Sequence, residues 1–375
     1  MVSANLNASS VLVSKSHNMN LPVIGLGTLQ VMYKGDADQP TKVETVISEQ
    51  AGKLPEGYKL TDLSHEKGIS RKEAIIRAME IGYRHLDTAF AYENEAAIGD
   101  AINEWIEQGK LKREDLFITT KLPNIAMKKE KVGEYLQKSL DNLRLKQVDL
   151  YLIQNPVGYE ELETKELYPR DDKGVIILDK TTNLCEVWQA MVDQVKAGKT
   201  KAIGMCNFKI GQLEKVIEKT GVYPDNIQAE CHLYFQQQEL RKWAQANGVV
   251  FTAYACLGSP AMMKVFHNAR GNDELRMKDP MKDPVVERIA IARQKTTAQV
   301  LLRHLLQLGL AVIPKSSVEM HMLENINIFD FDLTEAEMAE LNALDLGERG
   351  RKFSLAGFFP GYDKHPENPY PAEEN

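Results

Sequence analysis

Residues 82–108, GYRHLDTAFAYENEAAIGDAINEWIEQ, hold a short β-rich run followed by a segment with helical periodicity. The run at 85–89 predicts a strand, and apolar residues at steps of three and four predict a helix over 93–108. A strand followed by a helix is the repeating unit of parallel sheets. The same order recurs along nearly the whole chain, so this stretch indicates the fold class.

Eight β-rich runs follow one another along the chain, at 23–28, 85–89, 116–122, 148–154, 202–207, 227–232, 249–255 and 310–316. Between them, helical periodicity covers 71–81, 93–108, 131–143, 185–197, 210–220, 239–247 and 284–308. Eight parallel strands close into a cylinder, so we expect an α/β fold, a (β/α)8 TIM barrel, over residues 1–375 as a single domain. The chain exceeds the roughly 250 residues typical of such barrels, which indicates insertions.

Three segments fall outside the repeat. Short apolar runs at 11–13 and 21–23 flank a polar turn and predict an N-terminal β-hairpin that plugs the barrel. Residues 31–69 are charged and weakly periodic, which predicts an inserted loop that ends at a capping box beginning with Ser70. Residues 347–375 are rich in Gly, Pro and aromatic residues, and we expect them to form a C-terminal loop over the barrel mouth.

The composition of the chain limits the classes of partner that it is expected to bind. A net charge of -7 provides no broad basic face, so we expect no nucleic acid and favour a small-molecule partner. The four cysteines lack the paired spacing of zinc or redox motifs, and the N-terminus lacks the apolar core of a signal peptide. No stretch approaches the roughly 18 apolar residues of a membrane span. These features predict a reduced, cytoplasmic protein that binds no membrane.

The eight predicted strands all end in polar or ionisable residues, where barrel enzymes carry their chemistry. These residues are Thr28, Asp87, Lys121, Gln154, Asn207, Gln228, Tyr254 and Lys315. Each alone is compatible with a loop cap or a salt bridge, and Asp87 with Lys121 is compatible with a structural ion pair. Their joint placement favours a functional site. The histidines lie too far apart along the chain to indicate a metal, and no glycine-rich nucleotide motif opens a βαβ unit.

Four segments resemble signatures of the aldo-keto reductase family: GYRHLDTAFAYENEAAIG (82–99), DLYLIQNP (149–156), IGMCNF (203–208) and AVIPKSS (311–317). NIQAECH (226–232) and TAYACLGSP (252–260) extend the resemblance, which runs from about residue 11 to residue 373. It implies an NADP(H)-dependent oxidoreductase that reduces aldehydes or ketones. The family reduces its substrates with a tetrad of Asp, Tyr, Lys and His.

By this resemblance the first three members of the tetrad are Asp87, Tyr92 and Lys121. Tyr92 is the expected general acid: a phenol has an ordinary pKa of about 10, and an ammonium neighbour held by a carboxylate stabilises the phenolate. The usual His is Gln154 here, and the Trp that follows it is Asn155. Gln donates a hydrogen bond but does not titrate, so we expect carbonyl reduction slowed by ~100-fold or otherwise altered.

The substitution at Gln154 leaves two alternatives open. One branch of the family carries Glu at this position and reduces carbon-carbon double bonds of steroids, so reduction of conjugated double bonds is the first alternative. The second is a barrel that binds its cofactor without turnover, or a structural protein similar to the crystallins. Retention of Asp87, Tyr92 and Lys121 together favours an enzyme.

The resemblance also implies the cofactor contacts. Tyr254 is expected to stack on the nicotinamide, Asn207 and Gln228 to bind its carboxamide, and Cys206 to replace a serine beside them. Lys315 and Ser316 match residues on the 2'-phosphate of NADP, and Glu324 and Asn325 match residues on the adenine. Further cofactor contacts are expected at Thr28, Leu257, Ser259 and His321.

Two departures are expected to weaken cofactor binding. His321 stands where an arginine usually grips adenine and phosphate, so the preference for NADP over NAD is softened and NAD becomes possible. Ala261 stands where an aspartate often locks the covering loop, which suggests faster cofactor exchange.

Loops over the mouth are expected to select the substrate. The tail carries aromatic residues at Phe353, Phe358, Phe359 and Tyr362, which favour an apolar or amphipathic carbonyl compound over a small sugar. By resemblance we expect a monomer.

Overall fold

The computed structural model describes residues 6–29, 70–260, 278–353, 355 and 359–370. Eight strands pair in parallel in the order β10-β9-β8-β7-β6-β5-β4-β3. Their bounds are β3 Leu26–Gly27, β4 His85–Asp87, β5 Phe117–Leu122, β6 Val148–Ile153, β7 Thr200–Cys206, β8 Asn226–Glu230, β9 Val250–Tyr254 and β10 Ala311–Val312. A parallel bridge between Ile24 and Val312 joins the first strand to the last, so the sheet closes into the expected barrel.

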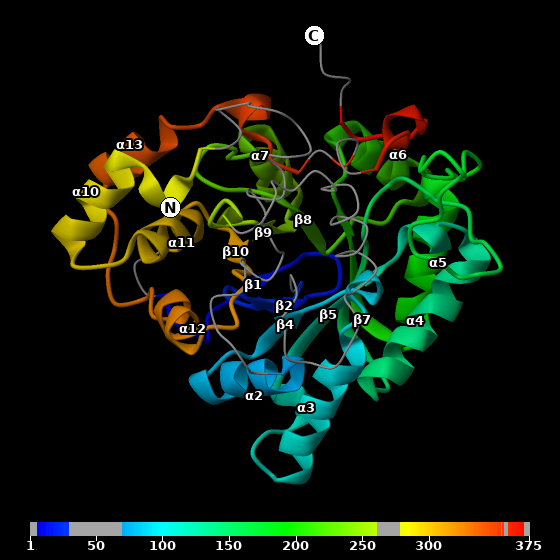
Figure 1. Cartoon of the computed structure of the whole chain (residues 1–375), viewed down its shortest axis with the longest axis horizontal. Coiled ribbons are helices and arrows are strands. Elements are labelled where there is room, and N and C mark those ends of the chain that lie inside the picture. The colour runs from blue at the N-terminus through cyan, green and yellow to red at the C-terminus, as the bar shows by residue number, and fades with distance from the viewer. Residues whose placement is uncertain (1–5, 30–69, 261–277, 354, 356–358, 371–375) are drawn as a thin grey trace.

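Ten helices in the described ranges surround this sheet (Figure 1). They are α2 Arg71–Ile81, α3 Glu95–Glu107, α4 Lys129–Leu143, α5 Leu184–Lys196, α6 Ile210–Thr220, α7 Gln238–Asn247, α10 Pro284–Arg293, α11 Thr297–Gln307, α12 Glu319–Ile326 and α13 Glu335–Asn342. One face of each strand packs against these helices, and the other face points into the barrel.

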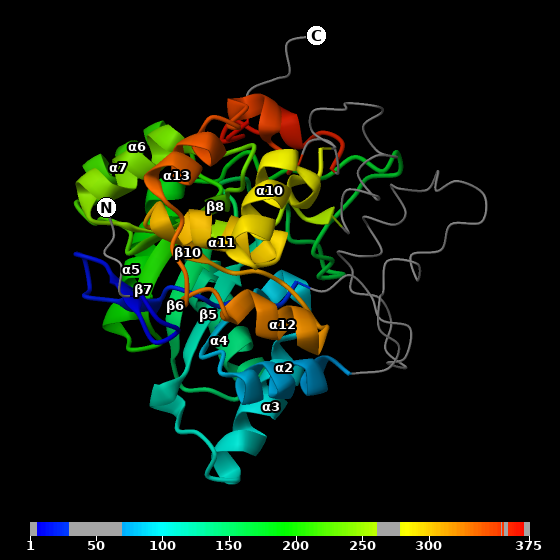
Figure 2. The same cartoon turned by 90° about the vertical axis from the view of Figure 1, so that its left-hand side faces the viewer.

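The barrel interior is apolar on the side of the N-terminal hairpin. Its core cluster contains Phe117, Leu150, Leu152, Ala202, Val250 and Ala311, together with Met19 and Leu21 from the N-terminal hairpin. That hairpin pairs β1 Val11–Val13 with β2 Asn20–Pro22 (Figure 2). At the N-terminal end of β8, the Asp225 carboxylate accepts hydrogen bonds from Ser14 Oγ at 2.6 Å and from the backbone N–H of His17 at 2.9 Å. The hairpin therefore closes the end of the barrel opposite the strands' carboxyl ends.

The helix predicted over 284–308 is wrong: two helices, α10 and α11, occupy this stretch. Gln294 adopts a left-handed backbone with φ of 54°, which ends α10. The Thr296 side chain then accepts from the N–H of Gln299, and the Gln299 side chain accepts from the N–H of Thr296, so a capping box starts α11. The apolar periodicity runs through both helices and conceals the break.

Smaller differences have local causes. The helix predicted from 93 begins at Glu95, because Glu93 takes a left-handed backbone with φ of 50°. The strand predicted over 310–316 is only β10, since Pro314 has no N–H with which to extend the ladder. Helices α12 and α13 carry no prediction from the sequence. The predicted loop at 31–69 lies outside the described residues.

The described part of the C-terminal tail runs along the carboxyl side of the barrel. At the end of β8 the buried Glu230 carboxylate accepts from the backbone N–H of Lys352 at 2.7 Å and of Phe353 at 2.9 Å. Further on, Pro360 O accepts from the Ile176 N–H at 3.0 Å. The tail is therefore attached next to the strand ends that carry the candidate site.

Candidate active site

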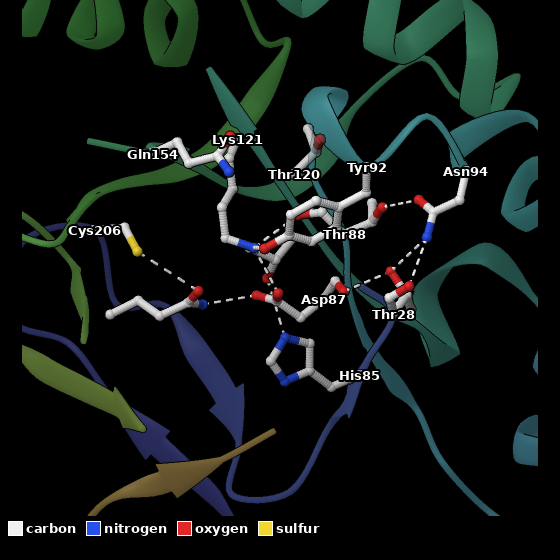
Figure 3. Close-up of polar contacts among 12 residues, drawn as sticks. Thr28, His85, Asp87, Thr88, Tyr92, Asn94, Thr120, Lys121, Gln154 and Cys206 are labelled. Carbon is white, nitrogen blue, oxygen red and sulfur yellow. Dashed lines mark hydrogen bonds and ion pairs between the residues drawn. The ribbon is translucent and has the colours of Figure 1, made fainter. Parts of the chain in front are cut away.

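A buried ion pair lies at the carboxyl end of the barrel, on β4 and β5 (Figure 3). Parallel pairing sets Asp87 opposite Thr119, and Lys121 follows two residues later on the same inward face of β5. Lys121 Nζ donates to Asp87 Oδ1 at 2.6 Å and to the backbone oxygen of Thr88 at 2.9 Å. Lys121 is 1% exposed and Asp87 is 2% exposed, so neither charge is screened by water.

Tyr92 adjoins this ion pair from the 3-10 turn Phe90–Tyr92. The Lys121 ammonium lies 3.5 Å from the Tyr92 hydroxyl oxygen, which is the outer limit of a hydrogen bond. Burial is the largest single influence on the pKa of Lys121 and lowers it, but the Asp87 carboxylate, Tyr92 and Cys206 together outweigh burial, and the net shift is upward. Lys121 therefore stays an ammonium at neutral pH.

The phenol itself responds mainly to burial. Burial raises the pKa of Tyr92 to about 12, and the Lys121 ammonium opposes that rise. The sequence suggested an ammonium that makes the phenol more acidic; its influence has that direction, but it only partly offsets burial. At neutral pH the Tyr92 hydroxyl is therefore protonated and able to donate its proton.

The predicted nicotinamide residues are linked by hydrogen bonds to the ion pair and to one another. Gln228 Nε2 donates to Asp87 Oδ2 at 2.7 Å, so an expected cofactor residue also orients the tetrad carboxylate. Tyr254 donates its hydroxyl proton to Asn207 Oδ1 at 2.7 Å, and Asn207 Nδ2 donates to the backbone oxygen of Gln154 at 3.0 Å. Cys206, 3% exposed, lies among these residues.

Gln154 follows β6 directly and faces the same cluster as Lys121 and Tyr92 (Figure 3). Its Oε1 is shielded from solvent and accepts no hydrogen bond from the described residues. The same holds for Oδ1 of Asn155, which is 7% exposed. A buried amide without a protein partner costs free energy, so these groups are suited to bind a ligand or water.

The remaining predicted cofactor residues lie on three neighbouring segments. Thr28 at the end of β3 donates its hydroxyl to Asp87 O at 2.9 Å, and a Cβ on the preceding Gly27 would lie 3.7 Å from Lys315 Cβ. Ser316 Oγ accepts from the Val318 N–H at 3.1 Å, just before α12, which carries His321, Glu324 and Asn325. Leu257 and Ser259 are half-buried after β9. Ala261 lies outside the described residues.

Aromatic side chains from two loops border the cluster. The rings of Tyr168 and Phe359 are stacked with centroids 5.0 Å apart, and Phe353 meets Tyr254 edge-on at 5.7 Å. Burial raises the pKa of Tyr168, and Tyr92 adds to the rise, so these two phenols are electrostatic neighbours. Tyr362 is fully buried in the core instead, and Phe358 lies outside the described residues.

Sequence reasoning missed Thr88, Asn94 and Tyr168. Asn94 precedes α3, and the only signal it carries in the sequence is that of a common helix-capping residue. Tyr168 lies in the loop after β6 without any periodic pattern. Neither residue type indicates by itself which partner it will meet.

Metal and membrane features were searched over the described ranges. There, no group of three or more His, Cys, Asp or Glu side chains is arranged to hold a metal ion. Nor does any helix in those ranges combine the length and apolar character needed to traverse a bilayer.

Comparison with known proteins identifies the class. The profile described as Aldo/keto reductase family matches residues 66–346. Aldo-keto reductase family 1 member D1 of Mus musculus is 35% identical over 368 residues, which cover 97% of this chain and 99% of that protein. Dihydrodiol dehydrogenase 3 of Bos taurus is 39% identical over 287 residues, covering 76% and 86% of the two chains.

The structure also resembles that of the aldose reductase from Schistosoma japonicum, with a TM-score of 0.74 and 35% sequence identity. The match covers 97% of this chain and 99% of that one. The chain belongs to the aldo/keto reductase family of oxidoreductases. Members of this family typically use NADPH to reduce small carbonyl compounds.

Proposed function

We propose that this protein reduces aldehydes or ketones to alcohols with NADPH, and that Tyr92 supplies the proton. The observation that carries the proposal is the chain of contacts from Asp87 through Lys121 to a protonated Tyr92 hydroxyl. When bound, NADPH supplies the hydride that adds to the carbonyl carbon. The protein's own task is to orient the carbonyl oxygen and to protonate it.

In the proposed mechanism the Tyr92 hydroxyl proton passes to the carbonyl oxygen as the alcohol forms. The phenolate left behind is stabilised by the Lys121 ammonium, which Asp87 holds at 2.6 Å. Gln154 Oε1 accepts no hydrogen bond from the described residues, and in this mechanism Gln154 Nε2 donates a hydrogen bond to the carbonyl oxygen. Because this amide has no ionisable proton, it orients the substrate but takes no part in the proton transfer.

The residues present fit a nicotinamide cofactor. Tyr254 is hydrogen-bonded to Asn207, and Gln228 is hydrogen-bonded to Asp87, so these three side chains lie beside the ion pair and would hold the nicotinamide ring and its carboxamide. Lys315 and Ser316 precede the N-terminus of α12, where backbone N–H groups favour a phosphate. Thr28, Leu257, Ser259, His321, Glu324 and Asn325 complete the proposed contacts. His321 lacks an arginine's fixed charge, so NAD is a possible second cofactor.

The substrate is proposed to be an apolar or amphipathic carbonyl compound, because Tyr168, Phe353 and Phe359 border the cluster. We further propose a cytoplasmic monomer, one barrel domain with residues 31–69 as an inserted loop and residues 347–375 as a loop over the mouth.

The test is oxidation of NADPH, followed by absorbance, with a panel of aliphatic and aromatic aldehydes, ketones and enones. Alcohol products support the proposal. Saturated ketones formed from the enones would instead favour reduction of conjugated double bonds. A fluorescence titration that shows NADPH binding, combined with no turnover of any substrate, would contradict the proposal and favour a cofactor-binding or structural protein.

A further inference from the structure

The segment that carries Tyr92 is closed into a ring by two buried side chains. It runs from the end of β4 to the start of α3, and its ends are Thr88 and Asn94 (Figure 3). Thr88 Oγ1 donates to Asn94 Oδ1 at 2.6 Å. Thr88 is 0% exposed and Asn94 5% exposed, so water does not compete for this bond.

Asn94 also fastens the ring to the neighbouring strand. Asn94 Nδ2 donates to the backbone oxygen of Thr28 at 2.8 Å and approaches Thr28 Oγ1 at 3.1 Å. Thr28 in turn donates its backbone N–H and its hydroxyl to Asp87 O, at 3.0 and 2.9 Å. Both polar atoms of the Asn94 amide are therefore engaged on the barrel side.

The same threonine meets the ammonium group. The backbone oxygen of Thr88 accepts from Lys121 Nζ at 2.9 Å, while its hydroxyl holds Asn94. Thr88 therefore contacts both the Lys121 ammonium and Asn94, which ends the segment that carries Tyr92. Through these two bonds Thr88 connects Lys121 to that segment.

The segment between Thr88 and Asn94 contains one residue with an unfavourable backbone conformation. Glu93, between Tyr92 and Asn94, has φ of 50° and ψ of 33°, a left-handed conformation that is unfavourable for a non-glycine residue. Such a conformation persists only where its surroundings impose it. The Asn94 contacts therefore lie directly beside the left-handed residue that follows Tyr92.

Helix capping is the competing explanation for Asn94, which occupies the N-cap position of α3. Its side chain makes no capping hydrogen bond to that helix, however. Both amide atoms point across the loop to Thr88 and Thr28 instead. The Asn94 amide therefore joins the two ends of the Tyr92 segment and binds the adjoining strand rather than capping the helix.

We propose that Thr88 and Asn94 are positioning residues that hold the Tyr92 hydroxyl at the reacting carbonyl. This inference rests on the proposed function, in which Tyr92 donates the proton. Neither residue is itself one of the proposed substrate or cofactor contacts, so their loss is expected to act on kcat and to leave cofactor affinity in place. A displacement of about 1 Å at a reacting group costs up to roughly 100-fold in rate.

The test compares Thr88→Val, which keeps the shape but loses the hydroxyl, with Thr88→Ser, which keeps the hydroxyl. Asn94→Ala and Asn94→Asp form the second pair, because Asp retains an acceptor for Thr88 but loses the donor to Thr28. We expect Thr88→Val, Asn94→Ala and Asn94→Asp to lower kcat 10-fold to 100-fold, with KM for the carbonyl and Kd for NADPH within about 2-fold. Thr88→Ser is expected to keep the kcat of the parent protein.

A readout independent of turnover separates this inference from the proposed function. Protein labelled with fluorotyrosine gives a 19F resonance for Tyr92, identified by its loss in Tyr92→Phe. We expect this resonance to shift or broaden in Thr88→Val and Asn94→Ala and to stay in place in Thr88→Ser, whether or not the protein reduces any carbonyl. An unchanged resonance and kcat in Thr88→Val would overturn the inference. Equal losses of kcat, NADPH affinity and Tm would also overturn it, because they indicate general unfolding.

Discussion

At residue 154 the protein presents an amide whose buried Oε1 accepts no hydrogen bond from the part of the chain that the structure describes, beside a phenol whose pKa burial raises to about 12. In the proposed mechanism Gln154 and Tyr92 stand where the family resemblance implies an imidazole and a phenol. An imidazole titrates near neutral pH and both donates and exchanges a proton, whereas an amide only donates a hydrogen bond. The chemical step is therefore expected to depend on Tyr92 alone for its proton.

Restoring the imidazole is the first prediction. Gln154→His is expected to raise kcat for aldehyde reduction by roughly 10-fold to 100-fold, because it adds an acid-base group within reach of the carbonyl oxygen. Gln154→Asn, a shorter amide, serves as the control and is expected to lower kcat. The measurement is steady-state NADPH oxidation, with Kd for NADPH determined in parallel. A histidine variant no faster than the parent would contradict the assignment of Gln154 to the site.

At this scale the sequence predicted that Asp87 and Lys121 lie together, because strand ends of a parallel barrel meet at one rim, while the place of Tyr92 beside them was implied by the family resemblance. Their exact partners were not predictable. The bond from Gln228 Nε2 to Asp87 and the bond from Thr88 to Asn94 join residues whose rotamers are chosen by packing, which no local pattern encodes.

Among the elements, the linker between α10 and α11 gives a prediction about stability. Gln294 ends α10 with φ of 54° and ψ of 43°, a conformation that glycine adopts without strain. Gln294→Gly is expected to stabilise the fold by roughly 0.5–1 kcal/mol, after the added flexibility of the unfolded chain is subtracted. Gln294→Ala keeps a Cβ and is expected to give no such gain. Urea unfolding of both variants decides; equal stabilities would show that the conformation is not strained.

Helix α12 gives a prediction about cofactor choice. His321 is exposed on this helix, six residues after Lys315. Replacing it by arginine adds a fixed planar cation suited to a phosphate, so His321→Arg is expected to tighten NADPH binding by roughly 10-fold and to leave NADH unchanged. Fluorescence titration at low and high salt checks this, because the gain must shrink as salt screens it. Equal tightening of both nucleotides would place residue 321 away from the 2'-phosphate.

The sequence predicted the order and type of most elements but not every boundary. Apolar residues continue at helical steps from α10 into α11, so periodicity could not reveal the left-handed residue at 294. Helix α12 carries a segment read as cofactor contacts, and its helical character was overlooked. In both places backbone geometry, not composition, decided the outcome.

For the whole molecule, closure of the barrel follows from the number of parallel strands and was predictable, whereas the points at which the tail is attached were not. The tail is attached through the backbone N–H groups of Lys352 and Phe353, which bond a buried carboxylate on β8. Every residue except proline has a backbone donor, so the sequence contains no signal for such an attachment.

Acid stability is the prediction at this scale. Burial lowers the pKa of both His85 and His304 to about 4, below the ordinary value of 6.5. The fold therefore favours neutral imidazoles. The stability that each neutral imidazole contributes is fully present above pH 6.5 and is lost as the pH falls toward 4. Between pH 7 and pH 5 we expect the free energy of unfolding to fall by roughly 2 kcal/mol for each of the two histidines.

Urea unfolding at the two pH values measures this loss. The matched variant is His304→Gln, since Gln keeps a donor for Asn342 Oδ1, which His304 Nε2 contacts at 2.8 Å, but does not titrate. Its loss between pH 7 and pH 5 is expected to be smaller than that of the parent by roughly 2 kcal/mol. An identical pH dependence in variant and parent would contradict the buried neutral state of His304.

The central claim is that the Tyr92 hydroxyl, adjoined by Lys121 and Asp87, protonates the carbonyl oxygen while Gln154 orients it. The most direct measurement compares the parent with Tyr92→Phe in single-turnover reduction of an aldehyde, with NADPH affinity determined for both. We predict a rate at least roughly 100-fold lower in Tyr92→Phe, at unchanged NADPH affinity. Equal single-turnover rates in the two proteins would contradict the claim, because a phenyl ring has no proton to give.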